Sequence, residues 1–209
     1  DVGIWTRGID RAIFHPGRRD LEWRRSLGVE DDVPVIGFVG RLVMEKGLGV
    51  FADSIDRLEA GGVRHKVLVV GKGPAREWFE NRLPAACFAG FQGGADLGRA
   101  VASMDMLFNP SVTETFGNVT LEAMAAGLPV VAARATGSES LVADGVTGRL
   151  IEAGDADAMA DALAFYCRDE AARHAAGEAG ERASRRFGWD EVNQALVDGY
   201  LRIVARHGR

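Results

Sequence analysis

The 209-residue sequence has few cysteines and prolines and no excess of basic side chains. Its two cysteines, Cys87 and Cys167, stand in unrelated contexts. This excludes a disulfide framework and a cysteine-rich zinc site, and favours a reducing, cytoplasmic location. With 25 Lys and Arg against 30 Asp and Glu, the net charge is −5. The acidic balance argues against nucleic acid as the main partner, because binding there relies on clustered basic residues.

Long apolar runs are also missing. No stretch reaches the roughly 18 apolar residues that a membrane-spanning helix needs, so no transmembrane segment is expected. The first residues, Asp1 to Trp5, have neither the basic region nor the apolar region of a signal peptide.

Glycine, in contrast, is abundant. The 27 glycines amount to roughly twice the usual share of about 7%. They are not part of a low-complexity run but stand at the ends of apolar segments. This placement is typical of α/β proteins, in which the chain turns from strand to helix at such points.

The apolar pattern alternates between strand-like and helix-like segments. Residues 33–40 form a nearly continuous apolar run, which predicts a strand buried on both faces, and apolar residues at helical spacing follow over 48–59. Further strands are expected at 65–70, 86–89, 106–108, 129–133 and 149–151, helices at 75–83, 96–104 and 118–126, and three alanine-rich helices from residue 155 onward. The alternation predicts a Rossmann-like parallel sheet with helices on both faces and C-terminal helices appended.

Residues 1–32 lack a regular pattern, apart from a short charged helix expected over 21–27. We expect this segment to be a connector that enters from another domain, and residues 33–209 to form the domain proper.

Ligands of such sheets bind at the carboxyl ends of the strands, and unusual residues follow the first strand there. Gly40 lets a ligand approach the backbone, and Arg41 and Lys46 place two cations at the same edge. A forked donor beside a point charge suits a diphosphate. The alternative is that both are ordinary solvated surface cations.

The second strand is followed by Gly71-Lys72-Gly73-Pro74. This segment lacks the spacing of a nucleotide-binding phosphate loop and of a dinucleotide fingerprint. A tight strand-to-helix turn is the better interpretation, with Lys72 near an anion.

The strongest signal follows the fourth strand. Glu114 lies in a loop, and Glu122 lies in the second turn of a helix that begins near Asn118. The backbone N–H groups of Gly117, Asn118 and Val119 and the positive end of the helix dipole favour an anion. Carboxylates on either side of that anion accept hydrogen bonds from hydroxyls, which suits a phosphate centre with a sugar at each end. The alternative is a glutamate that complements the helix dipole and a second glutamate in water.

The spacing Glu114-x7-Glu122, preceded by Arg41-x4-Lys46, resembles the donor-binding half of retaining glycosyltransferases of family 4, which have the two-domain GT-B fold. The resemblance runs from Gly8-Ile9-Asp10 to the C-terminus. Its other fragments are Gly90-Phe91, Met106 to Ser111, Gly127-Leu128-Pro129-Val130-Val131 and Asp144-Gly145-Val146-Thr147-Gly148. Each fragment is weak alone, but their order and spacing together are specific.

The resemblance implies a role for each matching residue. Arg41 and Lys46 hold the diphosphate of a nucleoside-diphosphate sugar and stabilise the leaving nucleotide, so neither a metal ion nor an organic cofactor is expected. Glu114 contacts the transferred sugar, and Glu122 binds the ribose diol. The remaining implied contacts are backbone N–H groups at Gly117, Asn118 and Val119, and Gly90 and Phe91 at the base.

The reaction implied is transfer of a hexosyl group, of the mannose or glucose type, from a UDP or GDP sugar to a hydroxyl with retention of configuration. The family's acceptor-binding N-terminal domain does not precede Asp1, so we expect this chain not to turn over alone. Any contact with the inner membrane surface is expected through that missing domain. Alternatives are a nucleotide-sugar-binding module without catalysis, an epimerase or phosphorylase on the same fold, and a structural interaction domain.

Overall fold

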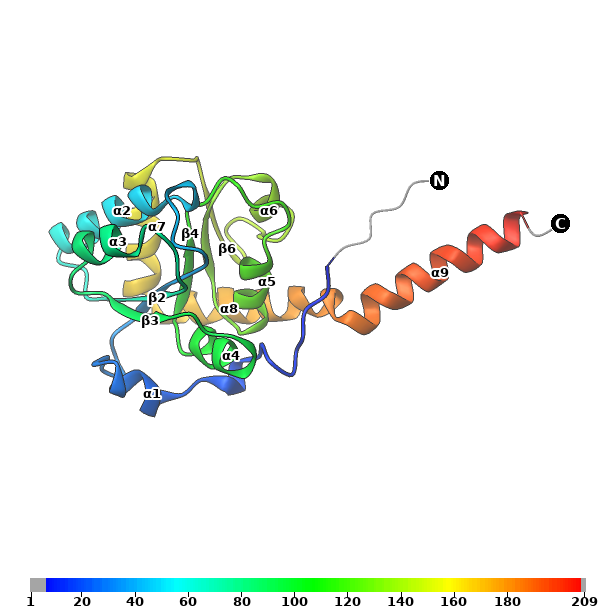
Figure 1. Cartoon of the computed structure of the whole chain (residues 1–209), viewed down its shortest axis with the longest axis horizontal. Coiled ribbons are helices and arrows are strands. Elements are labelled where there is room, and N and C mark those ends of the chain that lie inside the picture. The colour runs from blue at the N-terminus through cyan, green and yellow to red at the C-terminus, as the bar shows by residue number, and fades with distance from the viewer. Residues whose placement is uncertain (1–6, 208–209) are drawn as a thin grey trace.

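The computed structural model describes residues 7–207, in which strands and helices alternate along the chain (Figure 1). The strands are β1 (Val35–Val39), β2 (Lys66–Val70), β3 (Cys87–Gly90), β4 (Met106–Asn109), β5 (Val130–Ala133) and β6 (Gly148–Ile151). The α-helices are α1 (Leu21–Ser26), α2 (Leu48–Ala60), α3 (Arg76–Arg82), α4 (Gly94–Ala102), α5 (Asn118–Ala125), α6 (Thr136–Glu139), α7 (Ala156–Arg168), α8 (Glu170–Ser184) and α9 (Trp189–His207). Three short 3₁₀ turns join them: η1 (Pro16–Arg18), η2 (Met44–Lys46) and η3 (Arg185–Phe187).

Within the described residues the strands form one sheet in the order β3-β2-β1-β4-β5-β6. Every neighbouring pair is parallel, with Val35 opposite Lys66 on one side of β1 and Ile36 opposite Met106 on the other. The predicted Rossmann-like parallel sheet is therefore confirmed. The chain winds outward in one direction from β1 and in the other from β4, so the order reverses between these two strands.

Side chains of successive strand residues point to opposite faces, and each face has its own apolar core. Helices α2, α3 and α7 cover one face, where the ring of Phe51 lies edge-on against those of Phe38 and Phe79. Helices α4, α5 and α8 cover the other face, where Leu121 and Met124 of α5 are buried. The prediction of helices on both faces is confirmed.

Most element boundaries agree with the sequence prediction to within one or two residues. The exceptions are short: α6 and the three 3₁₀ turns carry too little apolar repetition to be recognised in the sequence. Figure 1 shows that α9, the last of the three predicted C-terminal helices, projects away from the body of the domain.

The predicted connector packs against the domain over its described part. Arg24 of α1 is 1% exposed and donates hydrogen bonds to the Asp105 carboxylate and to the Ser103 carbonyl, at the amino end of β4. Further towards the N-terminus, the N–H of Ile9 donates to the carbonyl of Phe187, just before α9. Residues 1–6, the beginning of the connector, lie outside the described residues.

Candidate functional site

The loops that follow β1 and β4 meet at the carboxyl edge of the sheet. Lys46, the last residue of η2, donates a hydrogen bond of 2.7 Å from its Nζ to Oε1 of Glu114, and both side chains are more than four-fifths buried. Gly47 follows with φ 75°, and a Cβ there would lie 2.8 Å from the carbonyl oxygen of Pro110. This close approach brings η2 against the loop after β4, which places Lys46 within reach of Glu114.

A glycine in the loop after β5 supports Glu114 from its other side. A Cβ at Gly137 would lie 2.8 Å from both the Cβ and the carbonyl oxygen of Glu114. Any larger residue would therefore displace the loop that carries this carboxylate. Gly137 belongs to α6, which the sequence reasoning missed. The one sequence signal for it is a further glycine shortly after an apolar strand.

Helix α5 begins directly beyond this loop. Gly117 precedes it in the left-handed conformation, with φ 89°, and no side chain of the described residues caps the helix. The first N–H groups of a helix have no partner within the helix, so those of Asn118 and Val119 remain available to a ligand. The structure therefore places an uncapped helix start a few residues after Glu114.

Glu122 lies one turn further along α5 in a different environment. With Asn118 it lines a cavity of about 130 Å³, closed by Gly8, Asp10 and Trp189 among others. Among the described residues no hydrogen bond or ion pair reaches its carboxylate, and burial raises the pKa of Glu122 to about 7. Arg41, Lys46 and Glu114 do not line this cavity, so the predicted residues fall into separate clusters.

The remaining predicted residues lie at the carboxyl ends of β1, β2 and β3. The N–H of Gly40 donates to the carbonyl of Val70, and the N–H of Gly71 donates to the carbonyl of Gly90, so the three strand ends are joined. Beyond them the Lys72 ammonium lies 5.0 Å from the ring centroid of Phe91, which is 67% exposed.

Arg41 lies at the same edge with an exposed side chain, and within residues 7–207 no ion pair reaches it. The structure thus brings Lys46 and Glu114 together, and Lys72 and Phe91 together. It leaves Arg41 exposed and outside both pairs.

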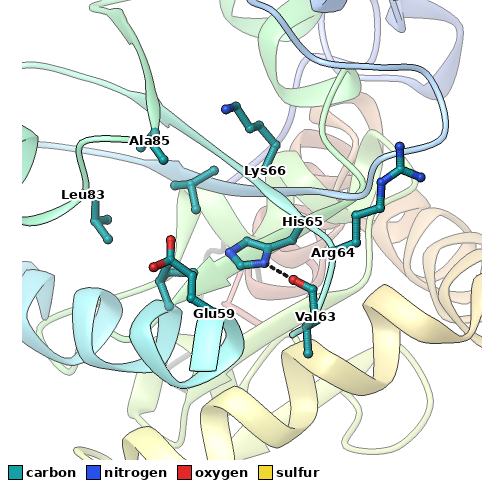
Figure 2. Close-up of a pocket in the computed structure, with 10 residues that line it drawn as sticks. Glu59, Val63, Arg64, His65, Lys66, Leu83 and Ala85 are labelled. Atoms are coloured by element: carbon teal, nitrogen blue, oxygen red, sulfur yellow. Dashed lines mark hydrogen bonds between the residues drawn. The ribbon is translucent and has the colours of Figure 1, made fainter. Parts of the chain in front are cut away.

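A second cavity, of about 220 Å³, lies at the opposite edge of the sheet, near the amino ends of β2 and β3. Figure 2 shows Glu59, His65 and Lys66 around it, with the His65 ring hydrogen-bonded to the carbonyl of Val63. None of the predicted site residues lines it. It is therefore separate from the carboxyl edge where ligands of such sheets bind.

Among residues 7–207, no group of three His, Cys, Asp or Glu side chains is arranged to hold a metal ion. No helix in that part of the chain is both long and apolar enough to cross a membrane.

Fold and site together define a class of protein: a Rossmann-like domain with cations, carboxylates and an open helix start at the carboxyl edge of its sheet. The sequence pattern of the family described as "Glycosyl transferases group 1" matches residues 33–169. The chain belongs to this glycosyltransferase family.

Curated relatives support this assignment. The chain is 31% identical, over 98% of its length, to the GDP-mannose-dependent alpha-mannosyltransferase of Corynebacterium glutamicum, and covers 48% of that protein. It is 36% identical, over 98% of its length, to the D-inositol 3-phosphate glycosyltransferase of Stackebrandtia nassauensis, and covers 49% of it. The chain therefore spans about half the length of the curated relatives it matches.

A solved structure is likewise matched by this chain over about half of its length. HepE from Anabaena, crystallised in complex with UDP and glucose, matches 92% of this chain at a TM-score of 0.80 and 26% identity. The match covers 55% of the HepE chain. The half-domain architecture expected from the resemblance to GT-B enzymes is thereby confirmed.

Proposed function

We propose that this chain is the donor-binding half of a retaining glycosyltransferase of family 4. The enzyme transfers a hexosyl group, of the mannose or glucose type, from a nucleoside-diphosphate sugar to a hydroxyl acceptor. The observation that carries the proposal is the Lys46–Glu114 contact of 2.7 Å. One residue follows β1 and the other follows β4, so the contact lies where the strand order reverses. Ligands of open α/β sheets bind at that point.

Each cluster of the edge has a part of the donor that it suits. Lys46 follows β1 and the start of α5 follows β4, on the two sides of the strand-order reversal, and together they bind the diphosphate, with the exposed Arg41 as a second cation. Glu114 accepts hydrogen bonds from the transferred sugar. Glu122 accepts hydrogen bonds from the ribose diol beside Asn118.

The exposed ring of Phe91 and the backbone of Gly90 border the base, and Lys72 adds a cation near the phosphates. Guanine and uracil are the two candidate bases. The Corynebacterium relative is named for GDP-mannose, and the Anabaena structure holds UDP.

These groups suit the transition state of glycosyl transfer. Cleavage of the sugar–phosphate bond develops negative charge on the leaving phosphate, and Arg41, Lys46 and the α5 dipole stabilise that charge in fixed positions. Because the chain's own cations supply this stabilisation, we infer that the reaction needs no metal ion.

The acceptor substrate binds to a second half of the enzyme. The relatives are about twice as long as this chain, which supports an acceptor domain outside it. Helix α9 offers a contact surface for such a domain: Val197, Tyr200, Leu201 and Val204 recur at helical spacing and are each about half exposed or more. The free thiols of Cys87 and Cys167 fit a cytoplasmic enzyme.

The test is turnover of the longer protein that contains this chain. Loss of one preorganised donor to a developing oxyanion typically costs about 3–4 kcal/mol, so Arg41→Ala and Lys46→Ala should each lower turnover at least about a hundredfold. Arg57→Ala, which removes an exposed cation of α2 far from the edge, is the matched control. Turnover of either site variant at the level of this control would refute the assignment.

A further inference from the structure

The Lys46–Glu114 ion pair joins the residue proposed for the diphosphate to the residue proposed for the sugar. Their side chains are only 18% and 17% exposed. Among the described residues each has the other as its sole charged partner. The ammonium proposed to bind the diphosphate is therefore already paired with a carboxylate.

A diphosphate must compete with the Glu114 carboxylate for the Lys46 ammonium. If Lys46 turns to the phosphate, Glu114 keeps its negative charge in a partly buried position without a partner, which is costly. If Lys46 uses its three N–H groups to bridge both, the carboxylate lies within a few ångströms of the phosphate oxygens and repels them. In both arrangements Glu114 opposes the binding of a bare nucleoside diphosphate.

A nucleotide sugar differs in one respect. Its sugar extends from the second phosphate towards Glu114 and brings hydroxyl donors that replace the hydrogen bond lost from Lys46. The backbone contact with Gly137 limits how far Glu114 can move away from this position.

We propose that Glu114, through its ion pair with Lys46, is the specificity determinant that favours nucleotide sugar over nucleoside diphosphate at this edge. The inference rests on the proposed function and deepens it. It gives Glu114 a role in expelling the product nucleotide as well as in holding the sugar.

Calorimetric titration of this chain tests the proposal, with UDP, GDP, UDP-glucose and GDP-mannose as probes. Glu114→Gln removes the charge and keeps the shape of the side chain. We expect the nucleoside diphosphate to bind this variant at least about tenfold more tightly than wild type. The nucleotide sugar should bind equally or more weakly, because its hydroxyls lose a charged acceptor. The dissociation constant of the nucleoside diphosphate divided by that of the nucleotide sugar should therefore fall at least about tenfold in Glu114→Gln.

Glu45→Gln is the matched control. It removes one negative charge from the adjacent, exposed residue and leaves the ion pair intact, so it should change the ratio less than about twofold. Glu114→Ala is a second variant with the same expected direction, and both variants are checked by their melting temperatures. A Glu114→Gln ratio within about twofold of wild type would overturn the proposal.

A double-mutant cycle isolates the ion pair. In a Lys46→Met background, Glu114→Gln should tighten nucleoside diphosphate binding by clearly less than in wild type, because no ammonium is left to release. The same gain in both backgrounds would show simple charge repulsion and overturn the role of the pair. Failure of all four probes to bind wild type would overturn the proposed function itself. Failure of the specificity proposal differs from this, because the probes would then still bind wild type.

Discussion

At the scale of single residues, Glu122 is a buried carboxyl group without a charged partner among the described residues. Burial raises its pKa to about 7, and no hydrogen bond or ion pair connects its carboxylate to Arg7 or Asn118, which line the same cavity. In the unfolded chain the same carboxyl titrates near its ordinary value of 4.5. Between these values the folded protein holds a proton that the unfolded chain releases. The stabilising effect of that proton is complete below about pH 4.5 and is lost as the pH rises through about 7.

The variant Glu122→Gln should therefore stabilise the chain at pH 8 and leave it unchanged near pH 4.5. The gain in the free energy of unfolding at pH 8 should be up to about 3 kcal/mol, or several degrees in melting temperature. Melting curves at both pH values measure it, with exposed Glu59→Gln as control. An equal shift at both pH values would contradict the burial of an unpaired carboxyl.

Asp105 is also a buried carboxyl group, but unlike Glu122 it has charged partners. Burial would raise its pKa, but the charges of Arg19 and Arg24 and the N–H of Val35 bring the pKa below the ordinary value. Because Arg24 is 1% exposed, its guanidinium depends on this carboxylate for compensation. The pair fixes α1 to the amino end of the sheet.

Asp105→Ala should lower the free energy of unfolding by about 3–5 kcal/mol, because it leaves the Arg24 charge buried and unpaired. Urea denaturation measures this loss. Asp31→Ala is the control: it removes a largely exposed pair with Arg25 and should leave the free energy of unfolding nearly unchanged. A loss for Asp105→Ala as small as that of the control would show that α1 is held in place by other contacts.

At the scale of elements, the Lys46–Glu114 contact depends on three loops that follow β1, β4 and β5. The first two carry the two residues of the pair. The third, which continues into α6, supplies Gly137 at the back of Glu114. A methyl group there overlaps the backbone of Glu114, and a backbone cannot move aside as easily as the end of a flexible side chain.

Gly137→Ala should therefore shift the Glu114 loop and break its contact with Lys46. We expect nucleotide-sugar affinity to fall at least about tenfold, with a loss of stability of about 1–3 kcal/mol. Gly49→Ala in α2 is the control, because a Cβ there meets nothing within 4 Å. Calorimetric titration of both variants decides the point. Unchanged affinity in Gly137→Ala would show that this glycine does not position Glu114.

The elements also show what could be predicted from the sequence. Runs such as 33–40 and the helical spacing over 48–59 depend on local periodicity, so their structures and most boundaries were predicted correctly. The Lys46–Glu114 contact joins residues 68 positions apart, and no local pattern predicts such a distance. The four-residue α6 and the burial of Arg24 were missed for the same reason, since both depend on tertiary packing.

At the scale of the whole molecule, the N-terminal segment lies against the start of α9. The backbone of Ile9 forms a parallel β-bridge with that of Gly188. A Cβ at Gly8 would overlap the indole ring of Trp189 at the start of α9. Figure 1 shows the N-terminal segment and α9 leaving the domain on the same side. The Glu122 cavity lies where the N-terminal segment meets the start of α9.

The most direct test of the donor-binding role is a thermal-shift titration of this chain with UDP, GDP and ADP, beside an Arg41→Ala variant. Ligand at about 100 times its dissociation constant adds roughly 2.7 kcal/mol to the free energy of unfolding, which raises the melting temperature of a chain of this size by several degrees. We predict that UDP or GDP gives such a shift with wild type and loses it with Arg41→Ala. No shift with any of the nucleotides, or an equal shift in both proteins, would contradict a nucleotide-sugar site at the carboxyl edge of the sheet.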